Sequence, residues 1–296
     1  MEYVLQTTGL TRKFKSTLAV NNVDMNIKKG DIYGFIGKNG AGKTTFIRLI
    51  AGLARVDQGE IRLFEQDNLD EGRWKGGTMV ENPALFPKMT AKANLHYYCL
   101  MLGLDPDENI EYMLNLVGLK DVGKKKVKNF SLGMKQRLSI AIALLGDPEF
   151  LLLDEPINGL DPTGIKEFRN LVLWLNKEKN ITILISSHIL GELSKIANRY
   201  GVINNGILID EFTNEELCER CSGELEIKVD DMDKAKEVLS KSENFSDYRV
   251  IDEHTIHFPN IPESAGQINT VIVKHDVFVM SSSDVGQDLE GYFVSI

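Results

Sequence analysis

The segment Phe130–Asp161, FSLGMKQRLSIAIALLGDPEFLLLDEPINGLD, joins two elements whose order restricts the fold. A serine and a glycine open a helical pattern, and an apolar run, FLLLD, then ends in two carboxylates. An apolar run of this length between turn signals predicts a strand buried on both faces, as in a parallel sheet. Asp154 and Glu155 therefore lie at the carboxyl end of a central strand, where ligands of open α/β sheets bind.

A glycine-rich loop lies upstream, GKNGAGKT at 37–44, between the buried-looking strand IYGFI and the helical segment TTFIRLIAGL. Glycines leave the backbone N–H groups free to point at phosphate oxygens at the positive end of the following helix. Lys43 is expected to reach the β- and γ-phosphates and the Thr44 hydroxyl to ligate Mg²⁺. The predicted nucleotide-binding residues are Gly37, Lys38, Asn39, Gly40, Ala41, Gly42, Lys43, Thr44 and Thr45.

Hydrolysis of a bound nucleotide needs one group that binds the metal and another that polarises the attacking water. We expect Asp154 to hold Mg²⁺ through water and Glu155 to act as the general base. His188 ends a second apolar strand, ITILISS, where an imidazole can bond the γ-phosphate or hold the water and the base in line. Glu155, His188 and Lys43 are thus the predicted catalytic residues.

The order of elements predicts an α/β fold with a mostly parallel sheet, preceded by short strands of an antiparallel layer. A helical subdomain, roughly 88–148, interrupts the alternation between the glycine-rich loop and the strand FLLLD, and a hairpin is expected at Asn204–Gly206. From about 223 the pattern becomes βαββαβ, which is typical of a small ferredoxin-like α+β domain, with a last helix near DLEGYF. The predicted domains are 1–215 and 216–296.

The net charge of -9 is unevenly distributed. Residues 1–210 carry 27 basic and 24 acidic side chains, whereas residues 211–296 carry 7 and 19. This asymmetry places a boundary near 211 and argues against nucleic acid on the acidic part, because phosphate backbones need Lys and Arg. No apolar run reaches the length of a membrane span, and the first residues lack the apolar core of a secretory signal, so we expect a cytoplasmic protein.

Together these motifs resemble the nucleotide-binding subunit of ATP-binding cassette (ABC) transporters over about residues 1–215. The matching elements are Walker A GKNGAGKT, a signature segment FSLGMKQR in place of LSGGQ, Walker B FLLLDE, a D-loop GLD and a switch histidine. The resemblance implies ATP and Mg²⁺ as cofactors and a head-to-tail homodimer. Ser131 and Gly133 of one copy would bind the γ-phosphate held by the other. Taken alone, Ser131 could equally be an ordinary helix N-cap.

By the same resemblance Phe14 matches the aromatic that stacks on adenine, although Phe also favours interiors. Asp161 matches the D-loop aspartate that communicates between the two sites. Glu81, in VENPALFPKMT, stands where the family has the Q-loop glutamine and is expected to touch the metal. Leu132 and Met134 depart from LSGGQ.

The segments VENPALFPKMT, FSLGMKQRLSIAIALL and DLEGYF resemble the branch that exports bacitracin, lantibiotics and similar antimicrobial peptides. The resemblance implies separate transmembrane permease subunits, through which this chain would sit on the inner face of the membrane. A soluble cassette ATPase that acts on ribosomes or chromosomes is the alternative. Those relatives usually carry two cassettes or a long coiled coil before the signature segment, and this sequence shows neither.

Overall fold

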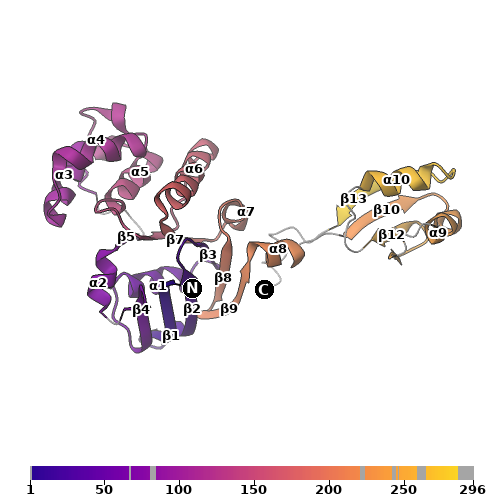
Figure 1. Ribbon diagram of the computed structural model, residues 1–296, viewed down its shortest axis with the longest axis horizontal. Helices are drawn as coiled ribbons and strands as arrows, with labels where there is room; N and C mark the ends of the chain where they lie inside the picture. Colours follow the sequence, from indigo (N-terminus) through magenta and orange to yellow (C-terminus); the bar gives the residue numbers. More distant parts are fainter. Residues whose placement is uncertain are drawn as a thin grey trace. The chain divides into compact units, whose positions relative to one another are not determined.

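The computed structural model describes residues 2–66, 68–80, 85–220, 224–241, 245, 247–258 and 265–285. The chain divides into two compact units, Met1–Asn214 and Glu215–Ile296. The division falls one residue before the boundary expected from the sequence. Figure 1 labels the helices and strands of both units.

A six-stranded sheet in the order β5-β6-β7-β3-β8-β9 is the frame of the first unit. Neighbouring strands from β5 to β8 are parallel, and β9 returns antiparallel to β8. Asn205 and Gly206 form the predicted hairpin with φ of 49° and 81°, as a two-residue turn of this kind requires. The strands are β3 (Ile32–Ile36), β5 (Gly76–Met79), β6 (Phe150–Asp154), β7 (Thr182–Ser187), β8 (Arg199–Asn204) and β9 (Ile207–Thr213).

An antiparallel sheet in the order β2-β1-β4 forms a second layer. Its strands are β1 (Tyr3–Phe14), β2 (Thr17–Lys28) and β4 (Gln58–Leu63). The helix α1 (Lys43–Ile50) shares one buried apolar cluster with both sheets. The Phe46 ring of α1 lies 5.1 Å from the Phe35 ring of β3. The two sheets therefore hold the first helix, and with it the end of the glycine-rich loop.

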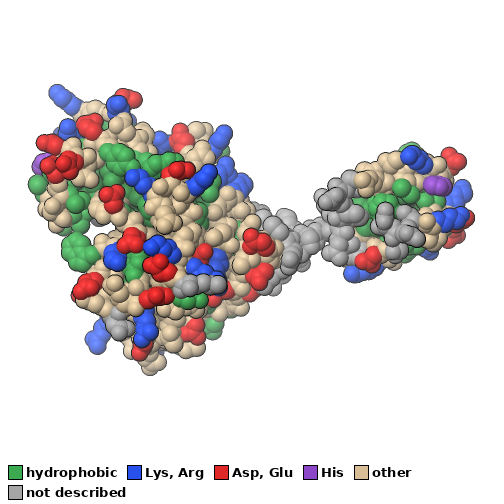
Figure 2. Space-filling model, viewed as in Figure 1, with side chains coloured by type: hydrophobic (Ala, Val, Ile, Leu, Met, Phe, Trp, Pro, Cys, Tyr) green, Lys and Arg blue, Asp and Glu red, His purple; other side chains and the backbone are tan. Residues whose placement is uncertain are grey.

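A group of helices fills the predicted insertion, and its α-helices begin at residues whose side chains cap them. Thr90, Asp105 and Ser131 cap three of them. Figure 1 shows α3 to α6 gathered at the end of the unit away from β1, β2 and β4. In Figure 2 hydrophobic side chains collect over this helical end, whereas charges of both signs are scattered elsewhere on the same face. The insertion contains α3 (Ala91–Leu102), α4 (Pro106–Leu116), 3₁₀ turns at Lys120–Val122 and Val127–Asn129, and α5 (Leu132–Ala143). The helices α6 (Pro162–Lys179) and α7 (Leu190–Leu193) follow it in the chain.

The helical group rests on the parallel sheet where α5 meets β5. Neither β5 nor α2 (Leu69–Trp74) was predicted from the sequence. Gly77 of β5 passes directly against the Ala143 carbonyl at the end of α5. A Cβ at Gly77 would overlap that carbonyl oxygen and lie 2.8 Å from Leu151 Cδ2. Absence of a side chain at this position is therefore a condition for the contact.

A buried polar pair joins β3 to β9 across the sheet. The Tyr33 hydroxyl donates to Glu211 Oε1 at 2.7 Å, and Gly201 on the strand between them leaves room for the tyrosine ring. Burial, reinforced by the neighbouring Glu211 carboxylate, raises the pKa of Tyr33 well above its usual value. Burial likewise raises the pKa of Glu211. The carboxylate therefore carries a desolvation cost when it ionises.

The second unit has the βαββαβ order expected from the sequence. Its sheet runs β11-β12-β10-β13 with every neighbouring pair antiparallel. Both helices contribute to one apolar cluster with the sheet, including Ile227, Leu239 and Ile268. The elements are β10 (Glu224–Val229), α9 (Met232–Ser240), β11 (Arg249–Val250), β12 (Thr255–Phe258), α10 (Ala265–Val273) and β13 (Val279–Val285), preceded by α8 (Asn214–Arg220). The helix expected near DLEGYF lies outside the described residues.

None of the helices in the described part of the chain has the length and apolar character needed to cross a bilayer.

Replacing Gly77 by alanine is expected to destabilise the first unit by about 2 kcal/mol, because the added methyl must displace α5 from β5. Urea denaturation followed by circular dichroism measures the effect. Gly76→Ala is the matched control, since its Cβ would meet only the Arg73 carbonyl at 3.3 Å and the Phe150 carbonyl at 3.8 Å. Equal stability of the two variants would contradict the tight contact.

Glu211→Gln keeps an oxygen that accepts from Tyr33 but does not ionise. Because its folded-state pKa is raised, Glu211 stabilises the fold most below the pKa of an unfolded glutamate, about 4.3, and this contribution is lost as pH rises through the raised value. The variant should therefore gain stability relative to the wild type as the pH rises towards neutrality. Urea denaturation across this range measures the difference, and a constant difference at every pH would refute the assignment.

Candidate functional site

The glycine-rich loop connects β3 to α1, and its backbone is held from behind by two other segments. A Cβ at Gly42 would overlap the Ala19 carbonyl oxygen of β2, and one at Gly37 would lie 2.9 Å from Ile203 Cγ2 of β8. The N–H of Gly206, in the β8–β9 hairpin, donates to the Ala41 carbonyl at 2.8 Å. Gly42, with φ of 114°, caps α1 without a side chain. The loop thus presents backbone N–H groups at a helix N-terminus, an arrangement that binds anions.

Lys43 begins α1 and is 5% exposed. Its ammonium folds back over the loop and donates to the Gly37 carbonyl at 2.6 Å and to the Lys38 carbonyl at 3.3 Å. It also pairs with Glu155 Oε1 at 3.1 Å. A cation is therefore held over the loop, with a carboxylate as its only ionic partner among the described residues.

Three parallel strands bring a hydroxyl and carboxylate network to the same edge of the sheet. The Thr44 hydroxyl donates to Asp154 Oδ2 at 2.8 Å, and the Ser186 hydroxyl donates to Asp154 Oδ1 at 2.6 Å. Both oxygens of this carboxylate, which is 2% exposed, are therefore bonded. Ser186 in turn accepts from the Glu155 N–H at 2.9 Å. Ser186 is not among the residues predicted from the sequence, although its place at the end of the strand ITILISS is a usable signal.

Glu155 lies between two potential cations. Its Oε1 faces Lys43, while its Oε2 lies 2.8 Å from His188 Nδ1. The backbone of Glu155 is left-handed, with φ of 47°, which a non-glycine residue adopts only when its surroundings fix it. The His188 side chain is 33% exposed, so the Glu155 and His188 pair is reachable from solvent. The two predicted catalytic partners are thus in contact.

The predicted metal ligands fit Mg²⁺ by their chemistry. Thr44 and Asp154 supply a hydroxyl and a carboxylate, and Mg²⁺ prefers oxygen ligands. No group of three His, Cys, Asp or Glu side chains that could hold a metal occurs in the described part of the chain. Nucleotide phosphates and water usually complete such a coordination shell. Glu81, the third predicted ligand, lies outside the described residues.

The signature residues lie elsewhere in the unit. Ser131 caps α5, where its hydroxyl accepts from the Met134 N–H at 3.3 Å, so the capping interpretation is confirmed. Its side chain is nevertheless exposed. Figure 1 shows α5 and α1 apart within the unit. Among the described residues, Ser131 and Gly133 make no hydrogen bond or close Cβ contact with the glycine-rich loop of the same chain.

Phe14 and Asp161 are both at the surface. Phe14 ends β1 and is 45% exposed, with the Arg12 guanidinium 4.6 Å from its ring centre, so the interior alternative is wrong. Asp161 is exposed and caps α6, accepting from the Gly164 N–H at 2.9 Å. Both side chains are thus accessible for contacts beyond this chain's own core.

Comparison with known proteins places this geometry in a family. Residues 20–158 match the family model described as ABC transporter. The bacitracin transport ATP-binding protein of Bacillus licheniformis is 40% identical over 299 residues, covering 100% of this chain and 98% of that protein. A lantibiotic transport ATP-binding protein of Streptococcus pyogenes is 41% identical over 70% of this chain and 90% of its own length.

Among solved structures, an ABC transporter component from Clostridium perfringens superposes with a TM-score of 0.66 at 27% identity, covering 73% of this chain and 91% of that one. The fold class expected from the sequence is confirmed. Similarity to transport proteins, along the whole chain for the Bacillus licheniformis protein, does not favour an action on ribosomes or chromosomes. The chain belongs to the ABC transporter family, in which it is an ATP-binding and ATP-hydrolysing subunit.

Proposed function

We propose that this chain binds MgATP, closes with a second copy over two nucleotides, and reopens after hydrolysis to drive a separate permease in the membrane. The observation that carries the proposal is the contact chain Thr44–Asp154–Ser186–Glu155–His188 beside the glycine-rich loop. It sets oxygen donors for a metal next to a carboxylate placed to act on water. Such an arrangement suits attack of water on a phosphoryl group.

The side-chain contacts of the described residues support the following roles. Lys43 neutralises the β- and γ-phosphates, and Thr44 and Asp154 hold Mg²⁺, which supplies charge neutralisation at the phosphates. Glu155 accepts the proton of the attacking water, and His188 holds Glu155 in place through its 2.8 Å contact. The loop from Gly37 to Thr45 and the exposed ring of Phe14 hold the nucleotide. Glu81 joins the metal ligands in this proposal.

The arrival of ATP changes the partner of Lys43. The ammonium pairs with Glu155 at 3.1 Å, and a γ-phosphate offers it a stronger anion. Once Lys43 turns to the phosphate, Glu155 keeps His188 as its neighbour and can face water. Nucleotide binding would thus free Glu155 to act as the base and, at the same time, bring in the γ-phosphate that the water attacks.

The position of the signature residues supports a second copy. Ser131 and Gly133 stand at a helix N-terminus, a favourable place for an anion, yet they lie apart from the loop of their own chain. A head-to-tail partner lets each copy complete the other's site, with Asp161 at the same face. The closed state is then favoured by γ-phosphate binding and lost on hydrolysis.

The transported compound is proposed from the relatives alone. Similarity along the whole chain to a bacitracin transport protein supports export of an antimicrobial peptide or a related compound. The chain would act in the cytoplasm, held at the inner face of the membrane by its permease. Nucleic acid is not a partner in this proposal.

Glu155→Gln is expected to lower the rate of ATP hydrolysis at least about 100-fold, because a general base contributes about 10²–10⁴. ATP affinity should be kept or increased, since the carboxylate that competes with phosphate for Lys43 is gone. Phosphate release and titration with a fluorescent ATP analogue measure the two effects. Glu149→Gln, just before the same strand, is the control and should hydrolyse normally. Wild-type hydrolysis by Glu155→Gln would exclude the base assignment.

Mixing two inactive variants tests whether each site is built from two copies. Lys43→Ala and Ser131→Arg should each abolish hydrolysis alone. A one-to-one mixture should recover up to about a quarter of the wild-type rate, since half of random dimers are mixed and each mixed dimer has one intact site. A mixture of Lys43→Ala with Glu155→Gln is the control and should stay inactive. Lys43 and Glu155 of one copy belong to the same site, so every site of a mixed dimer carries one of the two changes. No recovery in the first mixture would refute the shared site.

A further inference from the structure

Two reciprocal leucine and glycine contacts join the start of α5 to the segment Pro156–Asp161, called here the D-loop segment. Leu132 lies against Gly159, where an added Cβ would be only 2.5 Å from Leu132 Cδ2. In return, Leu160 lies against Gly133, where an added Cβ would be 3.1 Å from Leu160 Cδ2. Each leucine therefore occupies the space that a side chain on the facing glycine would need.

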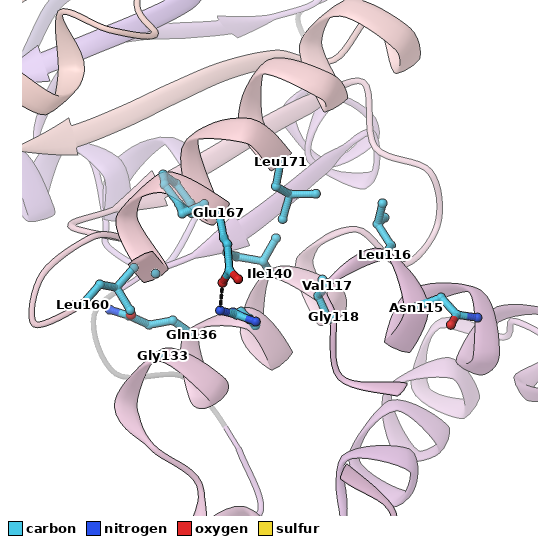
Figure 3. A pocket seen from close by; sticks show the side chains of 13 residues that line it. Asn115, Leu116, Val117, Gly118, Gly133, Gln136, Ile140, Leu160, Glu167 and Leu171 are labelled. Carbon is cyan, nitrogen blue, oxygen red and sulfur yellow. Dashed lines mark hydrogen bonds and ion pairs between the residues drawn. The ribbon is translucent and has the colours of Figure 1, made fainter. Parts of the chain in front are cut away.

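A hydrogen bond and an ion pair extend this contact along α5. Gln136 is 6% exposed, and its Nε2 donates to the Asn158 carbonyl of the D-loop segment at 2.9 Å. The next residue, Arg137, pairs with Glu167 of α6. Figure 3 shows Gly133, Gln136 and Leu160 close together, and the dashed line to Glu167. The D-loop segment is thus held by α5 on one side and continues directly into α6 on the other.

A cavity of about 260 Å³ lies behind this contact, between α4, α5 and α6. It is lined by Ile140, Phe168 and Leu171 among others. This space separates part of α5 from α6, so less side-chain packing joins the two helices there. The Arg137–Glu167 pair and the leucine and glycine contacts at the N-terminal end of α5 join α5 to α6 and to the D-loop segment beside this space.

Leu132 itself is not a core residue. Its side chain is 47% exposed, and the signature pattern LSGGQ that this segment resembles has glycine at the same place. Gly159 has φ of 74°, so it combines a left-handed backbone with the absence of a side chain that Leu132 requires. The two positions therefore complement each other across the contact.

We propose that Leu132 is a positioning residue that fixes the signature helix to the D-loop segment, so that both are presented to the second copy as one rigid surface. The inference rests on the two-copy arrangement proposed above. Ser131 precedes Leu132 in the chain, and Asp161 follows Leu160. Movement of either leucine therefore displaces a group that faces the partner's nucleotide, whereas the glycine-rich loop of the same chain is unaffected.

The test uses the full chain carrying Glu155→Gln, in which ATP-bound dimers persist. Leu132→Ala, Gly159→Ala and the double variant are compared with their Glu155→Gln parent. Leu173→Ala is the matched control, because Leu173 is a 40% exposed leucine on α6. Analytical ultracentrifugation in MgATP gives the dimer dissociation constant, a fluorescent ATP analogue gives the affinity of the monomer, and thermal unfolding checks the fold.

Each single variant should weaken dimerisation about tenfold, in line with the cost of displaced site residues. The double variant should dimerise no more weakly than the more weakened of the two single variants. Both changes disrupt the same contact between Leu132 and Gly159, so their effects are not additive. Monomer ATP affinity and the Leu173→Ala control should match the parent. If a Cβ at Gly159 prevents folding, Leu160→Ala replaces it, because Leu160 makes the reciprocal contact.

Unchanged dimerisation of Leu132→Ala, with only a lowered unfolding temperature, would reduce Leu132 to a structural role and overturn the inference. Additive effects of the two changes would overturn it as well. A parent that stays monomeric in MgATP gives a different result, since it contradicts the two-copy arrangement itself.

Discussion

The site depends on how closely the backbone of the glycine-rich loop approaches its neighbours. Gly42 abuts the Ala19 carbonyl, Gly37 abuts Ile203, and the hairpin at Gly206 bonds the Ala41 carbonyl. These contacts come from β2, β8 and the β8–β9 turn, so both sheets must be assembled before the loop has its shape. A loop fixed in this way keeps its N–H groups oriented before the phosphate arrives, which lowers the ordering cost of binding.

The charges at the sheet edge form one connected set. Asp154 is bonded at both oxygens by Thr44 and Ser186, whereas Glu155 faces Lys43 with one oxygen and His188 with the other. Ser186 also accepts from the N–H of Glu155, so the buried carboxylate of Asp154 and the partly exposed Glu155 are positioned by the same hydroxyl. Burial distinguishes the two carboxylates, because that of Asp154 is 2% exposed and bonded by two donors, while the Glu155 and His188 pair remains open to water.

The parts that sequence predicted are those encoded locally. Buried apolar runs gave β3, β6 and β7, and the capping residues Thr90 and Ser131 mark helix starts that the structure has. The strand β5 was missed because two consecutive glycines, as in GGTM, are typical of a turn. The reason for a glycine at 77, its contact with the Ala143 carbonyl, is visible only in the folded chain. Ser186 and the pairing of Leu132 with Gly159 were also missed, since each depends on a partner about 30 residues away that only the folded sheet brings near. The core position that residue type also allowed for Phe14 is excluded only by the fold, because residue type alone does not tell where a strand end lies.

The same distances explain why departures from the family's signature pattern are tolerable. A leucine at 132 would be costly if the D-loop segment carried a side chain at 159, but the left-handed glycine there leaves a space that the leucine fills. Gln136 meanwhile keeps its bond to the Asn158 carbonyl, so the geometry between α5 and this segment has a polar as well as an apolar component. A directional hydrogen bond fixes the register, and the leucine and glycine packing fixes the separation. Two constraints of different kind on one short interface leave little freedom for Ser131 and Asp161 to move independently.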